Sequence, residues 1–173
     1  MKLIKPLFIV NVLGYKILKS IKNDESIRYY KIDNICVKTR VKSIEKIIYK
    51  SYVKRKMPRD IFGIRIIYNN DYDHICYNML SNLERNFDVI EHSKKDYVTN
   101  PKENGYQSVH AHVSFFNLPV EIQIRNKEMD WRCNYGSCNE YYLVKQIILH
   151  KIYSRLYLDL ILIRYFIYLI FIT

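Results

Sequence analysis

Two segments of the chain alternate apolar and polar residues with a period of two. They are residues 109–115 (VHAHVSF) and 120–125 (VEIQIR), joined by a short turn sequence. Because successive side chains of a strand point to opposite faces, this pattern predicts a β-hairpin. On its second strand Glu121, Gln123 and Arg125 share one face, and apolar side chains occupy the other. A carboxylate, an amide and a guanidinium are therefore expected on one surface.

Apolar periodicity predicts further elements before the hairpin. Residues 35–41 have the pattern of a strand, and a helix is expected to follow them. Residues 59–68 predict a buried strand rich in β-branched side chains, with a charged entrance. Residues 71–85 predict an amphipathic helix with Asp71 as its N-cap. The apolar stripe expected on this last helix comprises Tyr72, Cys76, Met79, Leu80 and Leu83.

The remaining elements are short or lie near the ends. Residues 1–22 predict an amphipathic helix that packs on the domain, and the polar residues 23–26 predict a linker. Residues 87–90 predict a short strand. A helix carrying Asp130 is expected after the hairpin.

The length and charge of the chain bound its organisation and its ligands. A chain of 173 residues accommodates one domain with a substantial core. Lysine and arginine total 28 against 17 acidic residues, a formal charge of +11, so anionic partners are expected. Nucleic acid, a membrane surface and phosphorylated small molecules all meet that description. The four cysteines contain no second close pair, which argues against a zinc site, and a reducing compartment is the default expectation.

The loop before the hairpin carries side chains suited to a nucleotide. Lys95 and Lys102 can neutralise phosphates, Asn104 can bond the edge of a base, and Tyr106 can stack on it. The loop is expected to be exposed, since its NP and NG dipeptides favour turns. The alternative is an ordinary hairpin with a solvated polar face.

A second candidate site lies around residues 38–60. Lys42, Lys46 and Lys50 recur every four residues and therefore line one helix face. This arrangement fits a polyphosphate site, or alternatively a solvated basic face. Asp60, at the entrance of the buried strand, has the chemistry of a Mg²⁺ ligand. Alternatively it pairs with a neighbouring arginine, Arg59 or Arg65.

Several of these segments closely resemble the synthetase domain of the RelA/SpoT family. The family pattern KDY, NPKxNGYxSxH and VEIQIR is matched at residues 95–97, 100–110 and 120–125. The family's R-x-K with a further lysine is matched by Arg40, Lys42 and Lys50. Its DIxGIRII segment begins here at Asp60.

The resemblance implies an α+β fold with a mixed sheet of about five strands flanked by helices, similar to nucleotidyltransferases. It also implies a (p)ppGpp synthetase, a GTP diphosphokinase that transfers the diphosphate of ATP to the 3′-hydroxyl of GDP or GTP with Mg²⁺. Asp60 and Glu121 would be the catalytic metal ligands, and Glu121 would assist deprotonation of the hydroxyl. The residues implied for ATP are Arg40, Lys42, Lys50 and Arg65. Those implied for GDP or GTP are Lys95, Lys102, Asn104, Tyr106, His110 and Gln123. His112, which would share a direction with His110, is interpreted as incidental.

The chain departs from the family pattern at a few positions. Asn126 replaces a threonine, Lys46 a serine, Ser51 a methionine and Glu140 a histidine. The changes at Lys46, Ser51 and Glu140 bear on the ATP side. Those at Lys46 and Glu140 keep a second hypothesis open, namely a catalytically inactive nucleotide- or RNA-binding protein of the same fold. An unrelated basic RNA-binding module is a third, and steep salt dependence would mark it.

The resemblance sets the expected domain limits. Residues 1–34 form a helical segment and linker, 35–145 the synthetase-like domain, and 146–173 an apolar tail whose composition resembles translated AT-rich DNA. Asp159 and Arg164 interrupt that tail, so a membrane anchor is not expected. No specific nucleic-acid partner is expected. The expected location is the cytoplasm or a plastid-like organelle.

Overall fold

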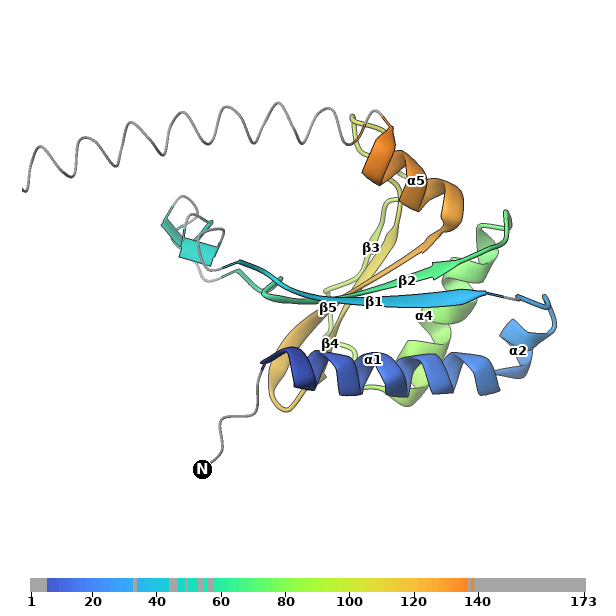
Figure 1. The fold of residues 1–173 in the computed structure, drawn as a ribbon, viewed down its shortest axis with the longest axis horizontal. Coiled ribbons are helices and arrows are strands. Elements are labelled where there is room, and N and C mark those ends of the chain that lie inside the picture. The colour runs from blue at the N-terminus through green and yellow to red at the C-terminus, as the bar shows by residue number, and fades with distance from the viewer. Residues whose placement is uncertain are drawn as a thin grey trace, which may run out of the picture.

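The structure is a computed structural model that describes residues 6–32, 34–43, 47, 48, 50–52, 55, 58–136 and 138. Its centre is a five-stranded mixed sheet with helices on both faces (Figure 1). The strand order is β1-β2-β5-β4-β3. The strands are β1 (Ile35–Val41), β2 (Phe62–Tyr68), β3 (Lys95–Asp96), β4 (Val109–Phe115) and β5 (Leu118–Asn126). The predicted α+β class with about five strands is confirmed.

The centre of the sheet combines one parallel pair with antiparallel neighbours. Strands β2 and β5 are parallel, whereas β1 pairs with β2, and β4 with both β3 and β5, in antiparallel fashion. The predicted hairpin is β4–β5. Its turn places Phe116 and Asn117 at φ 52° and 59°, the left-handed conformation that two-residue hairpin loops need. Leu118 and Pro119 were expected in the turn, but they are the first two residues of β5. Proline has no backbone N–H, and its absence costs little at the start of a strand.

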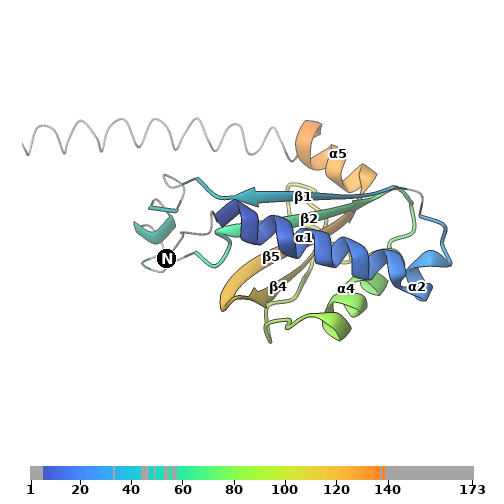
Figure 2. The same cartoon turned by 60° about the horizontal axis from the view of Figure 1, so that its bottom comes forward.

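One face of the sheet is apolar and covered by two helices, α1 (Pro6–Asn23) and α4 (His74–Asn86), as Figures 1 and 2 show. The buried stripe of α1 recurs at helical spacing, which confirms the predicted packing of the N-terminal helix on the domain. Fully buried residues of this stripe are Val10, Leu13, Ile17 and Ile21. They share one core with the inward side chains of the sheet, among them Ile64, Ile66, Val120, Ile122 and Ile124.

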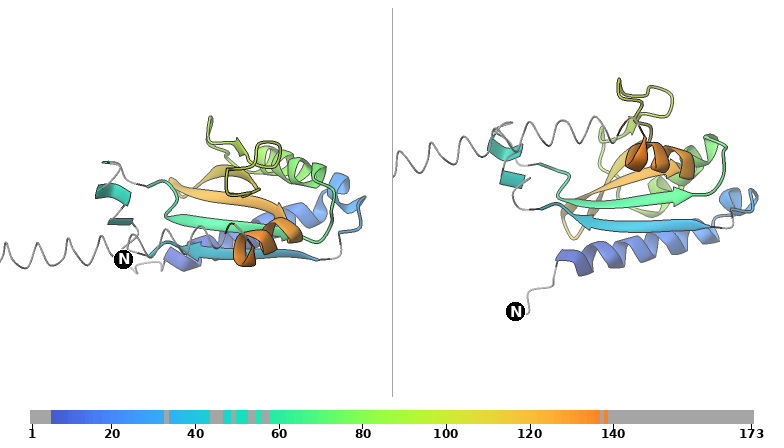
Figure 3. Two further views of the ribbon diagram at one scale, coloured as in Figure 1. Left: turned by 90° about the horizontal axis from the view of Figure 1, so that it is seen from above. Right: turned by 45° about the horizontal axis from the view of Figure 1, so that its top comes forward.

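The opposite face is polar, and the short helix α5 (Lys127–Tyr135) covers only one end of it (Figure 3). Helix α5 begins directly after β5. The side chain of Asn126 caps it by accepting a hydrogen bond from the Met129 N–H at 2.8 Å. Within the part of the chain that the structure describes, the β1 edge of this face is accessible, since the Lys38 and Arg40 side chains are 57% and 51% exposed.

Three local predictions were wrong. Helix α4 begins at His74 with Asp73 as N-cap, not Asp71; Tyr72 is 61% exposed, and Ile75 is buried instead. The expected linker 23–26 contains the start of a one-turn helix, α2 (Glu25–Arg28), because the Asp24 carboxylate caps it. The expected strand at 87–90 is reduced to a single bridge between Val89 and Val113.

Other predictions fall partly or wholly outside the described residues. Residues 47, 48 and 50–52 are helical, in line with the helix expected after β1. Lys46, Glu140 and the tail 146–173 lie outside the described residues. Within the described part of the chain, no helix combines the length and apolar character needed to cross a bilayer.

Candidate metal and nucleotide site

The register of the sheet aligns several of the predicted site residues in two rows across the polar face. The first row runs across four strands through Arg40, Gly63, Glu121 and His112. The second row runs across all five strands through Lys38, Arg65, Gln123, His110 and Lys95. Residues far apart in the sequence, which were predicted for ATP, metal and guanine nucleotide, thus come together on one surface.

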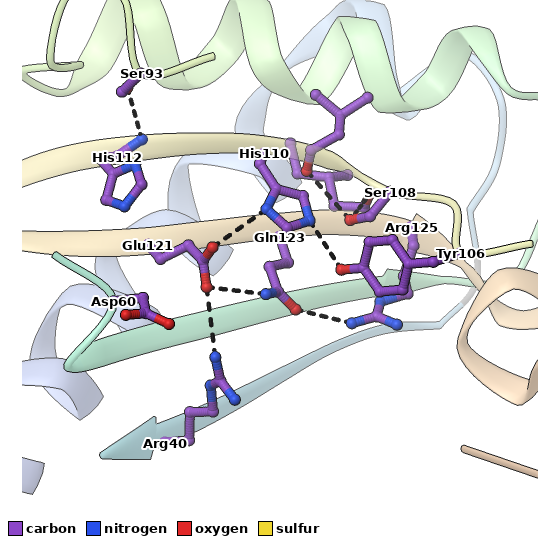
Figure 4. A network of polar contacts seen from close by, with 12 residues as sticks. Arg40, Asp60, Ser93, Tyr106, Ser108, His110, His112, Glu121, Gln123 and Arg125 are labelled. Atoms are coloured by element: carbon purple, nitrogen blue, oxygen red, sulfur yellow. Dashed lines mark hydrogen bonds and ion pairs between the residues drawn. The ribbon is translucent and has the colours of Figure 1, made fainter. Parts of the chain in front are cut away.

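Glu121 lies at the centre of a hydrogen-bond network (Figure 4). Its Oε2 accepts from Gln123 Nε2 at 2.9 Å and from Arg40 Nη2 at 3.4 Å, and its Oε1 lies 3.2 Å from His110 Nδ1. The side chain is 13% exposed. Burial alone would raise its pKa, but the His110 hydrogen bond and the charges of His110 and Arg40 lower the pKa of Glu121 to about 2. Glu121 is therefore ionised throughout the physiological range.

Gly63 gives Arg40 room to reach Glu121. A Cβ atom at Gly63 would lie 2.9 Å from Arg40 Nε and 3.1 Å from its Cγ. The Arg40 side chain thus lies directly over the Gly63 backbone, between β1 and β5. The glycine of the family's DIxGIRII segment is Gly63 in this chain, and a side chain there would collide with Arg40.

Asp60 lies just before β2 and contacts two of the predicted ATP lysines. Its Oδ2 is 2.5 Å from Lys42 Nζ and 2.8 Å from Lys50 Nζ. Burial opposes ionisation, but the hydrogen bonds and charges of both lysines hold the pKa of Asp60 well below its usual range. The alternative of pairing with Arg59 or Arg65 is not what the structure shows, since Arg65 contacts Asp130 instead at 3.2 Å.

Asp60 and Glu121 are neighbours on the same face, as Figure 4 shows, and the Asp60 charge acts on the pKa of Glu121. Two ionised carboxylates supply the hard oxygen donors that Mg²⁺ prefers. Among the described residues, no three His, Cys, Asp or Glu side chains gather into a metal site. A magnesium ion bound together with a nucleotide, however, usually takes only one or two carboxylates from the protein, and phosphate oxygens and water complete its ligands. The residues therefore fit the predicted ion.

Tyr106 was expected on an exposed loop, but it is only 5% exposed. Its hydroxyl lies 2.8 Å from His110 Nε2. Since His110 Nδ1 faces a carboxylate, which can only accept, Nδ1 carries a proton. The Lys102 ammonium lies over the rings of both Tyr97 and Tyr106, at 4.4 and 4.8 Å from their centroids. Stacking on a base requires Lys102 to move.

The other predicted nucleotide residues have mixed environments. Asn104 accepts a hydrogen bond from the Tyr106 N–H at 3.3 Å and so shapes the loop. Lys95 is exposed on β3. Burial and the neighbouring charge of Lys95 lower the pKa of Lys102, so these two cations lie within electrostatic reach of each other. Gln123 is 9% exposed, and protein groups engage both ends of its amide.

The structure adds two charged residues that the sequence analysis did not assign to the site. Lys38 is aligned with Arg65 and lines a cavity of about 110 Å³ together with Arg40, Gly63 and Gln123. Lys38 could have been predicted from the sequence, because it lies two residues before Arg40 on the same strand and therefore points to the same face. Asp130 contacts Lys38, Arg65 and Arg125 from α5. No sequence pattern reveals that contact, because it depends on where α5 packs.

A mixed sheet that presents two ionised carboxylates among arginines and lysines defines a protein with a candidate site for a metal ion and a polyphosphate. A more particular assignment comes from the family model described as "Region found in RelA / SpoT proteins", which matches residues 37–145. The chain belongs to the RelA/SpoT family.

Curated relatives share part of this chain. A probable guanosine-3′,5′-bis(diphosphate) 3′-pyrophosphohydrolase of Mycoplasma pneumoniae is 38% identical over 107 residues, covering 58% of this chain and 14% of the relative. Probable GTP diphosphokinase RSH3, chloroplastic, of Arabidopsis thaliana is 34% identical over 116 residues, covering 58% of this chain and 16% of the relative. The chain thus spans a small part of these longer proteins. One of them is named as a hydrolase and the other as a diphosphokinase.

Solved structures share the fold over most of both chains. Small alarmone synthetase 2 from Bacillus subtilis matches with a TM-score of 0.60 and 28% identity, covering 82% of each chain. Small alarmone synthetase 1 from the same organism, bound to its product pppGpp, matches with a TM-score of 0.55 and 26% identity, covering 77% of this chain and 75% of the other.

Proposed function

We propose that the chain is a (p)ppGpp synthetase that transfers the β,γ-diphosphate of ATP to the ribose 3′-hydroxyl of GDP or GTP. One observation carries the proposal. Each of the two neighbouring carboxylates is held by cations from the predicted ATP group: Asp60 by Lys42 and Lys50, and Glu121 by Arg40. A site of this kind matches a ligand that brings a cation and a polyanion together, as magnesium ATP does.

The ion pairs define how ATP would be held. When Asp60 and Glu121 bind the metal, Lys42, Lys50 and Arg40 would become available to the phosphates, so each charge would change partner without being left unpaired. Mg²⁺ would be held by the two carboxylates and would neutralise phosphate charge in the transition state. Lys38 and Arg65, which flank the same cavity, extend the positive surface along the phosphate chain.

The guanine nucleotide would bind at the β3–β4 end of the sheet. Lys95 and Lys102 are the cations there, and Lys102 covers the Tyr97 and Tyr106 rings until it moves to a phosphate. Its departure would open the face of Tyr106 for stacking on guanine. His110 links this end to the metal ligand, since it contacts both Tyr106 and Glu121.

Charge neutralisation and positioning would supply most of the rate enhancement. A carboxylate with a pKa near 2 is a weak base at neutral pH, so the low pKa of Glu121 supports its role as a metal ligand more than as a proton acceptor.

The test is incubation of the full chain with radiolabelled ATP, Mg²⁺ and GDP or GTP, followed by chromatography. A new, more highly phosphorylated guanosine nucleotide is expected. It should be absent with Asp60→Asn or Glu121→Gln and present with Glu91→Gln, a control that alters a carboxylate exposed to solvent. Binding of guanine nucleotides to the folded chain without product formation would overturn the proposal in favour of a non-catalytic nucleotide binder.

A further inference from the structure

Asp130 is the acidic residue that α5 places against the polar face of the sheet. Its Oδ1 is 3.2 Å from Arg65 Nη1 and 3.7 Å from Arg125 Nε, and its Oδ2 is 3.7 Å from Lys38 Nζ. Asn134 also donates to Oδ2, at 3.0 Å. The Asp130 side chain is 10% exposed. One buried carboxylate thus serves three cations on three different strands.

Arg125 is the most demanding of these cations, because it is completely buried. A buried guanidinium needs a counter-charge, since desolvation costs several kcal/mol per ion in proteins. Asp130 is the acidic side chain within ion-pair distance of Arg125 among the described residues. Arg125 Nε and Nη1 make no hydrogen bond there, so Asp130 acts on Arg125 mainly through its charge.

Arg125 in turn fixes the orientation of the Gln123 amide. Arg125 Nη2 donates to Gln123 Oε1 at 2.8 Å. A guanidinium can only donate, so the amide oxygen must face Arg125 and the amide nitrogen must face the other way. Gln123 Nε2 consequently donates to Glu121 Oε2 at 2.9 Å (Figure 4). The reversed amide would place two donors against each other at Arg125 and two acceptors against each other at Glu121.

We propose that Asp130 is a positioning residue, which acts through Arg125 and Gln123 to fix the orientation of the Glu121 carboxylate for metal binding. The proposal rests on the proposed function, because that function makes Glu121 a metal ligand. The order of contacts is Asp130, Arg125, Gln123 and Glu121, and Asp130 itself touches neither metal nor substrate. A positioning residue of this kind typically changes metal affinity or turnover by about 10- to 100-fold.

The decisive variant is Asp130→Asn, which keeps the shape of the side chain and removes its charge. It is expected to lower kcat by about 10- to 100-fold, while KM for GDP or GTP changes by less than about threefold, because the cations that Asp130 pairs with, Lys38 and Arg65, lie on the ATP side. Gln123→Leu should give a similar loss. In the double variant the losses should not multiply, because both changes interrupt the same chain of contacts.

Glu128→Gln is the matched control. Glu128 lies on the same helix, is 58% exposed and pairs with Arg132 rather than with the sheet. It removes one negative charge from α5 without touching the positioning chain. Its kcat should equal that of the wild type.

A second measurement needs no activity. The chain contains three glutamines, Gln107, Gln123 and Gln146, so selective ¹⁵N labelling of glutamine gives a simple side-chain amide spectrum, assigned with Gln→Glu variants. Asp130→Asn should shift the Gln123 amide and accelerate its exchange with solvent. Gln107 accepts from Arg132 of α5 and therefore reports any general movement of that helix. The Gln107 amide signal should not shift in Asp130→Asn.

The outcomes separate the two proposals. A wild-type chain that forms no guanosine product would refute the proposed function, while the amide spectrum would still decide on Asp130. An unchanged Gln123 signal in Asp130→Asn, or losses that multiply in the double variant, would overturn the positioning role. Equal shifts of Gln107 and Gln123 with a lower Tm would mean that Asp130 only docks α5, which would also overturn it.

Discussion

The two carboxylates of the polar face are ionised by different means. Asp60 lies in the segment before β2, and its partners are two lysines on flexible four-carbon chains, one of them 37% exposed. Glu121 lies within a central strand, and its partners include an amide and an imidazole from neighbouring strand positions. The first environment consists of exchangeable cations, and the second consists largely of hydrogen bonds fixed by the sheet.

This difference shows how one site can combine ligand exchange with rigidity. The lysines at Asp60 carry the charge that a polyphosphate needs, and they can transfer to it because their chains rotate. The donors at Glu121 are held by strand pairing and by the Gln123–Arg125 contact, so they keep that carboxylate oriented whatever is bound. The comparison predicts distinct phenotypes for changes at the two carboxylates.

The largest effects are expected from removing the charges themselves. Asp60→Asn and Glu121→Gln should each lower product formation by at least about 10²- to 10³-fold, because each removes an electrostatic contact to the transition state. Glu121→Gln should also lower the free energy of unfolding, by about 1–3 kcal/mol and by more than Asp60→Asn does. The NH2 of the new amide would face a buried donor held by the sheet, either Gln123 Nε2 or His110 Nδ1, whereas the lysines released in Asp60→Asn can turn to solvent. Activity assays and urea unfolding of both variants measure this. Equal destabilisation by the two changes would contradict the comparison.

The next effect concerns acid stability. The pKa of Glu121 falls from 4.5 to about 2 on folding, so its contribution to stability is complete above pH ~4.5 and is lost as the pH falls toward 2. A difference of that size corresponds to at most about 3 kcal/mol. The stability difference between wild type and Glu121→Gln should therefore be constant from pH 7 to 5 and shrink below pH 4.5. Urea unfolding at stepped pH measures it, and a difference that grows on acidification would refute the assignment.

The arrangement of the strands was largely predictable, because alternation is a local property. The pattern at 109–125 was enough to place Glu121 and Gln123 on one face opposite the apolar core. The family resemblance supplied the mixed sheet and linked that face to Arg40, Lys42 and Asp60. Which residues stand side by side in a row, such as Arg40, Gly63 and Glu121, required the register of non-consecutive strands, which a local pattern does not contain.

Features that depend on packing between distant elements were missed. The burial of Tyr106 results in part from Arg125 of β5, whose guanidinium carbon lies 5.4 Å from the Tyr106 ring centroid, although the sequence around Tyr106 is typical of a turn. The helix at Glu25–Arg28 follows from Asp24, whose carboxylate is also bound by Asn82 and Arg85 of α4. In both cases the deciding partner lies elsewhere in the chain or on another element.

A change at Lys50 tests whether the Asp60 environment is exchangeable. Lys50→Met should weaken ATP binding by about tenfold, the effect of losing one phosphate contact of about 1.4 kcal/mol. It should strengthen Mn²⁺ binding in the absence of nucleotide, because Asp60 loses a competing cation. Calorimetric titrations with each ligand measure the two effects. Lys94→Met, which breaks the exposed Lys94–Glu84 pair, is the control and should change neither. If both affinities fall, the lysine does not exchange partners as proposed.

The smallest effect is expected at two glycines next to β1. Gly63 lies in the neighbouring strand β2, and Gly14 lies in α1. In Gly63→Ala the new Cβ would meet Arg40 Nε at 2.9 Å on the polar face, and in Gly14→Ala it would meet Thr39 Cγ2 at 3.1 Å on the apolar face. Gly63→Ala should raise KM for ATP by about three- to tenfold, since a displaced guanidinium loses part of a charge-assisted hydrogen bond. Gly14→Ala should leave KM unchanged and alter the free energy of unfolding by at most about 1 kcal/mol, because helix propensity and crowding oppose each other. Steady-state kinetics and urea unfolding of both variants make the comparison. A KM effect from Gly14→Ala as large as that from Gly63→Ala would show that the two faces are not independent. In that case the position of β1 as a whole, rather than the space above Gly63, would determine how Arg40 meets ATP.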